Sequence, residues 1–352
     1  MVPPRLELAV YGLVAAPVLH LADEHGILAA LLAEGPLTAR AAAERTGTDH
    51  DTVERMLLVL TAFGIVERAD GGEFAVPGEM APFLDGAGPD HIGGFVQHMV
   101  DESAGRLAAL EDLLRRGSDA VDADRPAPYD RFYRDEASTG AFLQAMWDLS
   151  YGVSQELAEL AALDGHRHLV DVGGANGPFA VAALEWAPGL TAVVFDLPEV
   201  APHLEETRRR HGLADRLAFQ AGDFFVDDLP EGDLIALGYV LSNWPDAERL
   251  ALLRKAHAAC APGGRVLVME RLFDDGRRGP ISTAVMNLEM QVETRGRHRT
   301  GAEYRAMLAE AGFAGTEVRR SSRDKHLVIG TKPGQGCRCR SAAPTPRSGS
   351  GW

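Results

Sequence analysis

Cysteine is scarce in this chain, and so is positive charge. Three cysteines occur among 352 residues, Cys260, Cys337 and Cys339. They are too few for a disulfide framework, and no cysteine and histidine cluster has the spacing of a zinc site, so we predict no bound metal. Lysine and arginine number 35 against 51 aspartates and glutamates, which leaves a net charge of -16. Because nucleic acids and anionic membranes bind positive surfaces, we expect neither as a partner.

Long apolar runs are missing as well. No uninterrupted apolar stretch approaches the roughly 20 residues of a transmembrane helix. The opening segment, MVPPRLELAVYG, carries prolines and acids where a signal peptide needs a basic segment and a longer apolar one. We therefore predict a soluble cytoplasmic protein, and with 46% apolar residues the chain can form about two domains.

Residues 1–92 have the pattern of a winged-helix-like domain. In APVLHLADEHGILAALLA, apolar residues recur every three or four positions, as in one core-facing helix: Val18, Leu21, Ile27, Leu28, Leu31 and Leu32. Two short helices are then predicted to meet near Gly47, followed by two strands around a turn at Gly71 and Gly72.

A winged helix also raises the hypothesis of a DNA-binding regulator with a ligand-sensing second domain. Its recognition helix would lie in residues 49–66, which carry two aspartates, one glutamate and a single arginine before a continuous apolar run. Major-groove recognition needs arginine, lysine, asparagine or glutamine facing the bases. We expect this helix to pack against another subunit instead, in a homodimer.

Residues 93–164 hold large side chains at helical spacing, although aromatic residues make up only 7% of the chain. The group lies in YDRFYRDEASTGAFLQAMWDLSYG and consists of Phe132, Tyr133, Phe142, Met146, Trp147 and Tyr151. Each of these alone fits an ordinary helix core. Together they predict a helical linker that caps a flat ligand and contacts the substrate.

After Gly165, apolar strands alternate with amphipathic helices. This alternation predicts an α/β fold with a mostly parallel, doubly wound sheet over residues 165–333. Residues 334–352 are rich in glycine, serine, proline and arginine without periodicity and predict a disordered tail. Cys337 and Cys339 in that tail could bind a metal or be oxidised, but an uninvolved tail is the simpler interpretation.

The segment LVDVGGANG is typical of a strand that runs into a ligand-binding turn. Asp171 precedes the turn, Gly173 and Gly174 allow a sharp bend, and Gly177 lets a ligand or a helix approach closely. The following strand ends in Asp196, about 20 residues later, where a carboxylate can accept the hydroxyls of a ribose.

Two further features indicate which nucleotide binds. The third strand ends in AGDFF, so that Asp223 and Phe224 offer a carboxylate and a flat ring to an adenine. The spacing Gly-Gly-Ala-Asn-Gly differs from the G-x-G-x-x-G of dinucleotide sites, and Asp171 suits a ligand with an ammonium group rather than a diphosphate. We therefore favour S-adenosylmethionine over NAD.

In this order the motifs resemble a known family, the class I O-methyltransferases that act on small molecules and carry an N-terminal winged-helix dimerisation domain. The resemblance covers roughly residues 10–331 and rests on DVGGANG, FDLPEV, GDFF, YVLSNWPD, CAPGGRVLVMERLF, MNLEMQV and RTGAEYRAMLAEAGF. LSNWPD is similar to the bacterial polyketide-tailoring branch, notably anthracycline 4-O-methyltransferases.

The resemblance implies a fold, a cofactor and a reaction. It implies a Rossmann-like, seven-stranded methyltransferase domain, a homodimer, and transfer of a methyl group from S-adenosylmethionine to a hydroxyl of an aromatic, polyketide-like natural product in secondary metabolism, with S-adenosylhomocysteine as product. It also implies that Leu197 and Tyr239 contact the cofactor and that Asn287 and Met290 contact the substrate. C- or N-methylation stays open, because the nucleophile belongs to the substrate.

The chain departs from the family pattern at two places. Ala175 stands where the family often has a glycine, a small change that we expect to be tolerated. Ser242 and Asn243 stand where much of the family has His-Asp, and in the wider family that histidine is the general base.

Three interpretations of the missing histidine remain. Methyl transfer can proceed largely by proximity and orientation, with Ser242 and Asn243 orienting the substrate. Alternatively His298, at the position of a family acid, is the base, although a solvated surface histidine is the simpler reading; Glu270 matches a second family acid. Finally, the protein can be a hydroxylase or decarboxylase that keeps S-adenosylmethionine as a bound scaffold.

Overall fold

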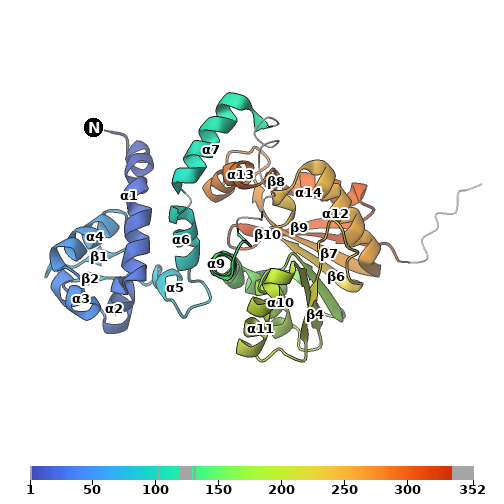
Figure 1. Ribbon diagram of the computed structural model, residues 1–352, viewed down its shortest axis with the longest axis horizontal. Helices are drawn as coiled ribbons and strands as arrows, with labels where there is room; N and C mark the ends of the chain where they lie inside the picture. The colour runs from blue at the N-terminus through green and yellow to red at the C-terminus, as the bar shows by residue number, and fades with distance from the viewer. Residues whose placement is uncertain (1, 102, 119–128, 130–131, 335–352) are drawn as a thin grey trace, which may run out of the picture.

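The computed structural model describes residues 2–101, 103–118, 129 and 132–334. The predicted disordered tail, with Cys337 and Cys339, lies outside the described residues apart from Gly334. Figure 1 shows a small helical unit at the N-terminus, a set of helices in the middle of the molecule, and a sheet flanked by helices.

The N-terminal unit contains four helices and a short hairpin: α1 (Pro4–Glu24), α2 (Ile27–Glu34), α3 (Ala39–Thr46), α4 (His50–Ala62), β1 (Glu67–Arg68) and β2 (Phe74–Ala75). Thr38 caps α3 and Asp49 caps α4, each by accepting a backbone N–H, and Gly47 between them adopts a φ of 67°. The predicted helix pair and two-stranded wing are therefore confirmed.

One helix prediction for this unit is wrong. The apolar stretch from Ala16 to Ala33 forms parts of two helices, because the chain breaks at His25 and at Gly26, where φ is 72°. Periodicity alone could not show the break, since the apolar spacing continues across it.

The exposed apolar surface of this unit also differs from expectation. Val53, Leu57 and Leu60 of α4 are buried inside the unit's own core, and of this helix only Leu58 is a large exposed hydrophobic side chain. Helix α1 instead exposes a series of large apolar side chains: Leu6, Leu8, Val10, Tyr11, Leu13 and Val14. We therefore expect α1, rather than residues 49–66, to face another subunit.

Helix α1 bears on the membrane prediction too. It is the one helix, in the part of the chain that the structure describes, that is long and apolar enough to cross a membrane. Such a single helix is weak evidence, because core helices of soluble proteins and signal sequences pass the same test. The apolar stretch within α1 is still shorter than about 20 uninterrupted residues, since Arg5 and Glu7 lie in its first turn.

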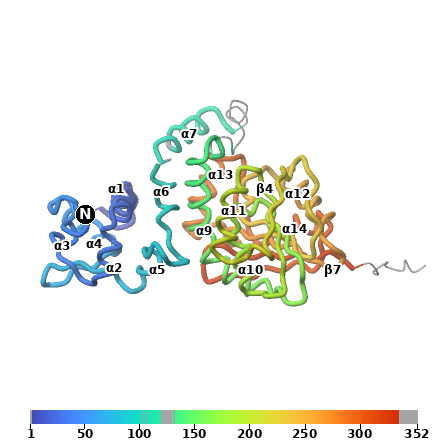
Figure 2. The backbone as a smooth tube through the Cα atoms, turned by 60° about the horizontal axis from the view of Figure 1, so that its bottom comes forward, coloured from blue at the N-terminus to red at the C-terminus, as the bar shows by residue number. Residues whose placement is uncertain are grey.

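The middle of the chain forms α5 (Ala81–Leu84), α6 (Gly93–Asp101), α7 (Ser103–Arg116) and α9 (Glu136–Ala161). Asp135 caps α9, and the Asp148 carboxylate on this helix accepts a hydrogen bond of 2.8 Å from the backbone N–H of Gly94 on α6. Figure 2 shows α6 running beside α9, between the N-terminal unit and the sheet.

The sheet contains eight strands: β3 (His168–Val172), β4 (Thr191–Asp196), β5 (Leu217–Ala221), β6 (Gly232–Gly238), β7 (Cys260–Phe273), β8 (Arg299–Thr300), β9 (Ala314–Arg319) and β10 (Lys325–Thr331). Seven form the path β5-β4-β3-β6-β7-β10-β9, and the short β8 pairs with the end of β7. Strands β3 to β7 pair in parallel, whereas β10 is antiparallel to both neighbours. The predicted seven-stranded, mostly parallel sheet is confirmed, with β8 in addition.

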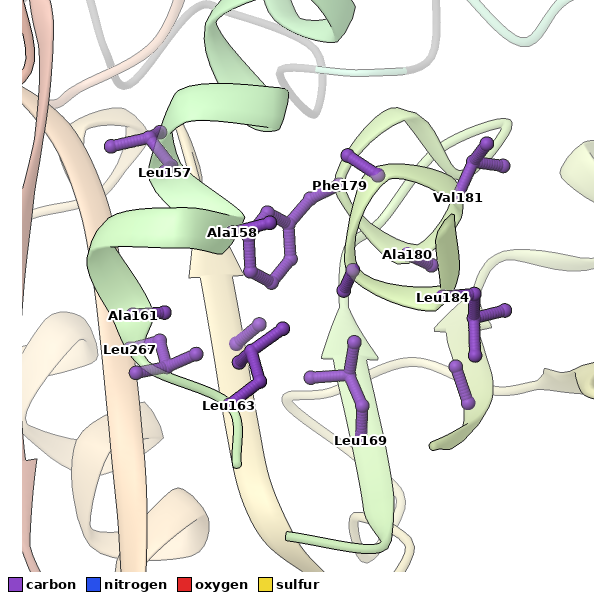
Figure 3. Packing of buried hydrophobic residues seen from close by; sticks show 14 of the residues in the cluster. Leu157, Ala158, Ala161, Leu163, Leu169, Phe179, Ala180, Val181, Leu184 and Leu267 are labelled. Atoms are coloured by element: carbon purple, nitrogen blue, oxygen red, sulfur yellow. The ribbon is translucent and has the colours of Figure 1, made fainter. Parts of the chain in front are cut away.

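Helices cover both faces of the sheet. They are α10 (Pro178–Trp186), α11 (Ala201–Arg210), α12 (Asp246–Ala259), α13 (Ile281–Glu293) and α14 (Gly301–Glu310), with short 3-10 turns at Pro198–Val200 and Leu241–Asn243. Figure 3 shows Leu157 of α9 and Phe179 of α10 packed over Leu169 of β3. Both faces are buried, so the central strands are almost wholly apolar and their polar residues gather at the strand ends.

Candidate cofactor and substrate site

The turn after β3 requires glycine at two positions. Gly173 has a φ of 64°, and a Cβ there would lie 2.9 Å from Cγ2 of Val240. A Cβ on Gly174 would lie 2.7 Å from Cγ of Asp171. Ala175 adopts a φ of 52° with its Cβ in place, which shows how the turn accommodates the departure from the family pattern.

Gly177 serves helix packing rather than the cavity. It has a φ of 85° just before α10, and a Cβ there would lie 2.9 Å from Cδ1 of Leu204 on α11. It is absent from the lining of the cavity described next. Of the two roles predicted for it, close approach of a helix is the one the geometry shows.

A cavity of about 300 Å³, the outer cavity, opens at the carboxyl ends of β3, β4, β5 and β6. Its lining includes the remaining predicted cofactor residues: Asp171, Gly173, Gly174, Asp196, Leu197, Asp223, Phe224 and Tyr239. The strand ends thus bring together side chains from four separate motifs, as expected of an open α/β sheet.

Asp196 is held by the backbone on both sides. Oδ2 accepts the N–H of Ala175 at 2.8 Å and Oδ1 accepts the N–H of Leu197 at 2.7 Å. Burial raises the pKa of this carboxyl to about 6, against the lowering by these hydrogen bonds. Asp196 therefore fixes the turn and keeps lone pairs directed at the cavity.

Asp171 is more deeply buried, at 2% exposure, and burial raises its pKa to about 7 while the charge of Lys325 opposes the rise. Its Oδ2 has no hydrogen-bond partner among the residues that the structure describes. A buried carboxylate oxygen without a donor is costly, so this atom fits a cationic ligand group.

Asp223 and Phe224 follow β5 at the rim. Oδ1 of Asp223 accepts the N–H of Phe225 at 2.8 Å, which fixes the turn. The rings of Phe224, Phe225 and Trp244 contact one another with centroids 4.6 to 6.0 Å apart. The result is an apolar wall beside a carboxylate.

A second, inner cavity of about 70 Å³ continues from the first. The two share a wall of Tyr129, Phe142, Met146, Tyr239 and Asn243. The rest of the inner cavity is lined by both apolar and polar side chains: Phe95, His98, Phe132, Leu149, Ser242, Arg271, Met286, Met290, Glu293, Thr294 and His298. Phe132 and Phe142 stack with ring centroids 4.4 Å apart. Such a cavity suits a flat, apolar molecule with a polar edge.

The structure places two predicted substrate contacts away from both cavities. Trp147 and Tyr151 stack on each other at 4.5 Å, and the Tyr151 hydroxyl donates to Oε2 of Glu185 at 3.1 Å, against the sheet core. Neither lines the outer or the inner cavity, whereas Met146 lines both. Aromatic spacing along α9 does not show which face of the helix each side chain occupies.

Of the two substrate contacts predicted in MNLEMQV, only one lines the outer or the inner cavity. Met290 lines the inner cavity. Asn287 does not line it; its Oδ1 accepts the backbone N–H of His298 at 2.9 Å. Asn287 therefore holds the loop that carries His298.

Ser242, Asn243 and Glu270 form one hydrogen-bonded corner. The Ser242 N–H donates to Oε1 of Glu270 at 3.0 Å, and burial raises the pKa of Glu270 to about 7. Nδ2 of Asn243 donates to the Tyr239 carbonyl at 2.7 Å and to the Tyr129 hydroxyl at 2.6 Å. Asn243 thus braces the wall between the two cavities.

His298 is buried, at 2% exposure, so the interpretation as a surface histidine is wrong. The loop before His298 packs against the corner of Ser242, Asn243 and Glu270, so closely that a Cβ on Gly296 would overlap the Ser242 carbonyl oxygen. Nδ1 of His298 lies 3.8 Å from Oε2 of Glu270. Burial, followed by the charges of Arg271 and Arg249, lowers the pKa of His298 to about 3, so the ring is neutral at physiological pH.

Tyr133, named in the aromatic group that predicted a cap, lines the outer cavity. Several lining residues were not predicted individually. Among them, Phe225, Trp244 and Lys325 line the outer cavity, and Tyr129, in the same aromatic segment, lines both. Lys325 comes from β10, far along the chain, and no local motif marks it.

Comparison with known proteins identifies the family to which the chain is similar. A family model described as the O-methyltransferase domain matches residues 110–314, and one described as the O-methyltransferase dimerisation domain matches residues 8–78. The chain is 33% identical to 3-hydroxy-5-methyl-1-naphthoate 3-O-methyltransferase of Streptomyces sahachiroi over 88% of each protein.

Two further comparisons agree. The chain is 32% identical to the tetracenomycin polyketide synthesis 8-O-methyl transferase TcmO of Streptomyces glaucescens, over 86% of this chain and 89% of that protein. Its fold is similar to the crystal structure of human N-acetylserotonin methyltransferase in complex with S-adenosylmethionine, with a TM-score of 0.81 and 29% identity, over 94% of this chain and 97% of that one.

Proposed function

The chain belongs to the O-methyltransferase family and is an S-adenosylmethionine-dependent methyltransferase, and from this premise we propose that its substrate is a flat aromatic natural product of polyketide type, methylated on a hydroxyl. The observation that supports this substrate class is the inner cavity, with its stacked Phe132 and Phe142 and with polar side chains such as His298 in its lining. The naphthoate and tetracenomycin enzymes carry such substrates in their names.

We propose that the outer cavity holds the cofactor. Asp196, already fixed by two backbone N–H groups, accepts the ribose hydroxyls, and Asp223 with Phe224 takes the adenine. The unpartnered Oδ2 of Asp171 fits the cofactor's ammonium group, while Gly173 leaves room for its chain. The cofactor, when bound, supplies a methyl group already activated on a sulfonium.

Orientation rather than a strong base is the mechanism that the lining around His298 supports. A neutral His298 can accept the hydrogen bond of a substrate hydroxyl, but a pKa of about 3 makes it a weak base. Glu270 and the backbone of Ser242 hold this corner, and Asn243 braces the wall facing the cofactor. Holding two reactants in line contributes roughly 7 to 11 kcal/mol, and the phenolic proton can pass to solvent.

The experiment that tests this function combines the purified protein, deuteromethyl S-adenosylmethionine and a panel of phenolic polyketides, followed by mass spectrometry. The labelled methyl group should appear on the product with an equal amount of S-adenosylhomocysteine. Oxygen gain or loss of carbon dioxide with the cofactor intact would mean hydroxylation or decarboxylation, an alternative that the family match does not support.

We also propose a cytoplasmic homodimer joined through the N-terminal unit. The match to a dimerisation domain over residues 8–78 supports association. The exposed apolar side chains of α1 supply the surface, because a soluble monomer rarely leaves so continuous an apolar series in water.

A further inference from the structure

Lys325 is a buried cation that faces the outer cavity. It begins β10, is only 2% exposed, and lies opposite Arg271 of β7 in the sheet. Its Nζ lies 4.0 Å from the centre of the Tyr239 ring and would be 3.4 Å from a Cβ on Gly238. Tyr239, Gly238 and Lys325 all line the cavity.

Among the described residues, the ammonium group of Lys325 has no hydrogen-bond acceptor. Its Nζ donates no hydrogen bond there and forms no ion pair, and it lies over the ring of Tyr239. Burial lowers the pKa of Lys325 to about 8, so the group is still charged at pH 7. A buried charge without a hydrogen-bond acceptor is costly, which indicates that the acceptor arrives with the ligand.

A buried group of opposite charge lines the same cavity. Carboxylates oppose the fall in the pKa of Lys325, chiefly Glu270 and then Asp171, and of these two only Asp171 lines the outer cavity. Its Oδ2 has no hydrogen-bond partner among the described residues, and the carboxylate forms no ion pair with Lys325. A cation and an anion that line one cavity without pairing are complementary to a zwitterion, and an α-amino acid group is the zwitterion that the cofactor carries.

We propose that Lys325 binds the α-carboxylate of S-adenosylmethionine and S-adenosylhomocysteine, opposite the ammonium group that Asp171 takes; this rests on the proposed cofactor site. A substrate anion is the less suitable ligand, because Lys325 lines the outer cavity and not the inner one. Because Asp196 binds the ribose in the proposed site, Lys325 is placed to bind the amino-acid end of the cofactor.

The test is a binding cycle with two ligands and three proteins. S-adenosylhomocysteine and its decarboxylated analogue, in which hydrogen replaces the carboxylate, are titrated calorimetrically into the wild type, Lys325→Met and Lys332→Met. Lys332, just beyond the same strand, donates to the carbonyls of His257 and Cys260 and does not line the cavity, so it is the matched control.

We expect the wild type and Lys332→Met to prefer the complete ligand by roughly 10- to 100-fold, as for a hydrogen bond between charged groups. In Lys325→Met the complete ligand should lose that factor while the analogue binds as before. Equal weakening of both ligands, or no change, would overturn the proposal. If Lys325→Met fails to fold, equal binding of both ligands by the wild type overturns it, whereas no binding of either ligand by the wild type would count against the cofactor site itself.

Discussion

Replacing Asp196 by alanine tests the placement of the cofactor. In the free protein Asp196 accepts N–H groups of Ala175 and Leu197 at 2.8 and 2.7 Å, and its remaining lone pairs face the outer cavity. Loss of ribose hydrogen bonds to a charged acceptor should weaken S-adenosylhomocysteine by about 1 to 3 kcal/mol, or roughly 5- to 150-fold in Kd.

The same substitution leaves two backbone N–H groups without their acceptor. Each unsatisfied group costs about 1 to 3 kcal/mol if it stays buried, so Asp196→Ala should also lower the melting temperature of the free protein. Asp215→Ala, an exposed aspartate after α11, is the control for loss of one carboxylate. Calorimetric titration at pH 7.5 separates binding from folding, because only the folded fraction contributes to the stoichiometry. A folded Asp196→Ala protein that binds within about twofold of the wild type would refute the assignment.

Three further predictions concern His298, the protons released when the cofactor binds, and the dimer. His298→Ala should lower kcat/KM by about 10- to 100-fold and His298→Gln, which keeps an acceptor, by less; steady-state kinetics showing a loss beyond about 10⁴-fold would indicate an essential base. Burial raises the pKa values of Asp171 and Asp196 to about 7 and 6, and the ligand's ammonium group and ribose hydroxyls, respectively, prefer the ionised carboxylates. S-adenosylhomocysteine should therefore bind more tightly as pH rises from 5 to 7.5, with proton release, and less tightly above about pH 8 as Lys325 loses its proton. Titrations between pH 5 and 7 in buffers of different ionisation enthalpy measure the proton release, and proton uptake in that range would contradict it. Leu13→Asp on α1, where Leu13 is 79% exposed, should raise the dimer dissociation constant at least about tenfold by light scattering, unlike a charge placed at exposed Val226; an unchanged dimer would exclude α1 as the interface.

The cofactor end of the sheet was predictable because strand ends converge. Asp171, Asp196 and Asp223 are far apart in sequence, but parallel strands bring their carboxyl ends to one edge, so each acid could be placed from the strand before it. The glycine turn was predictable for a different reason. A sharp turn after a strand leaves no space for side chains at Gly173 and Gly174, and the sequence has glycine at both positions.

The side chains that line the substrate cavity were less predictable. Trp147 and Met146 are neighbours on α9, yet one packs on the sheet core and the other lines both cavities. Helical spacing identifies a face only when a partner surface is known. The burial of His298 depends on Gly296 lying against Ser242, which is far away in the sequence. The arginines on either side of His298 in the sequence predict an exposed loop instead. Lys325 reaches the cavity only through the antiparallel pairing of β10 with β7.

The most direct test of the central claim follows the labelled methyl group to its atom. A phenolic compound found active in the panel and the same ring system without the hydroxyl are each incubated with the protein and deuteromethyl S-adenosylmethionine, and the products are located by NMR. The account predicts the deuterated methyl on oxygen in the first compound, S-adenosylhomocysteine in equal amount, and no product from the second. Label on carbon or nitrogen, or on the compound that lacks the hydroxyl, would contradict hydroxyl methylation in this cavity.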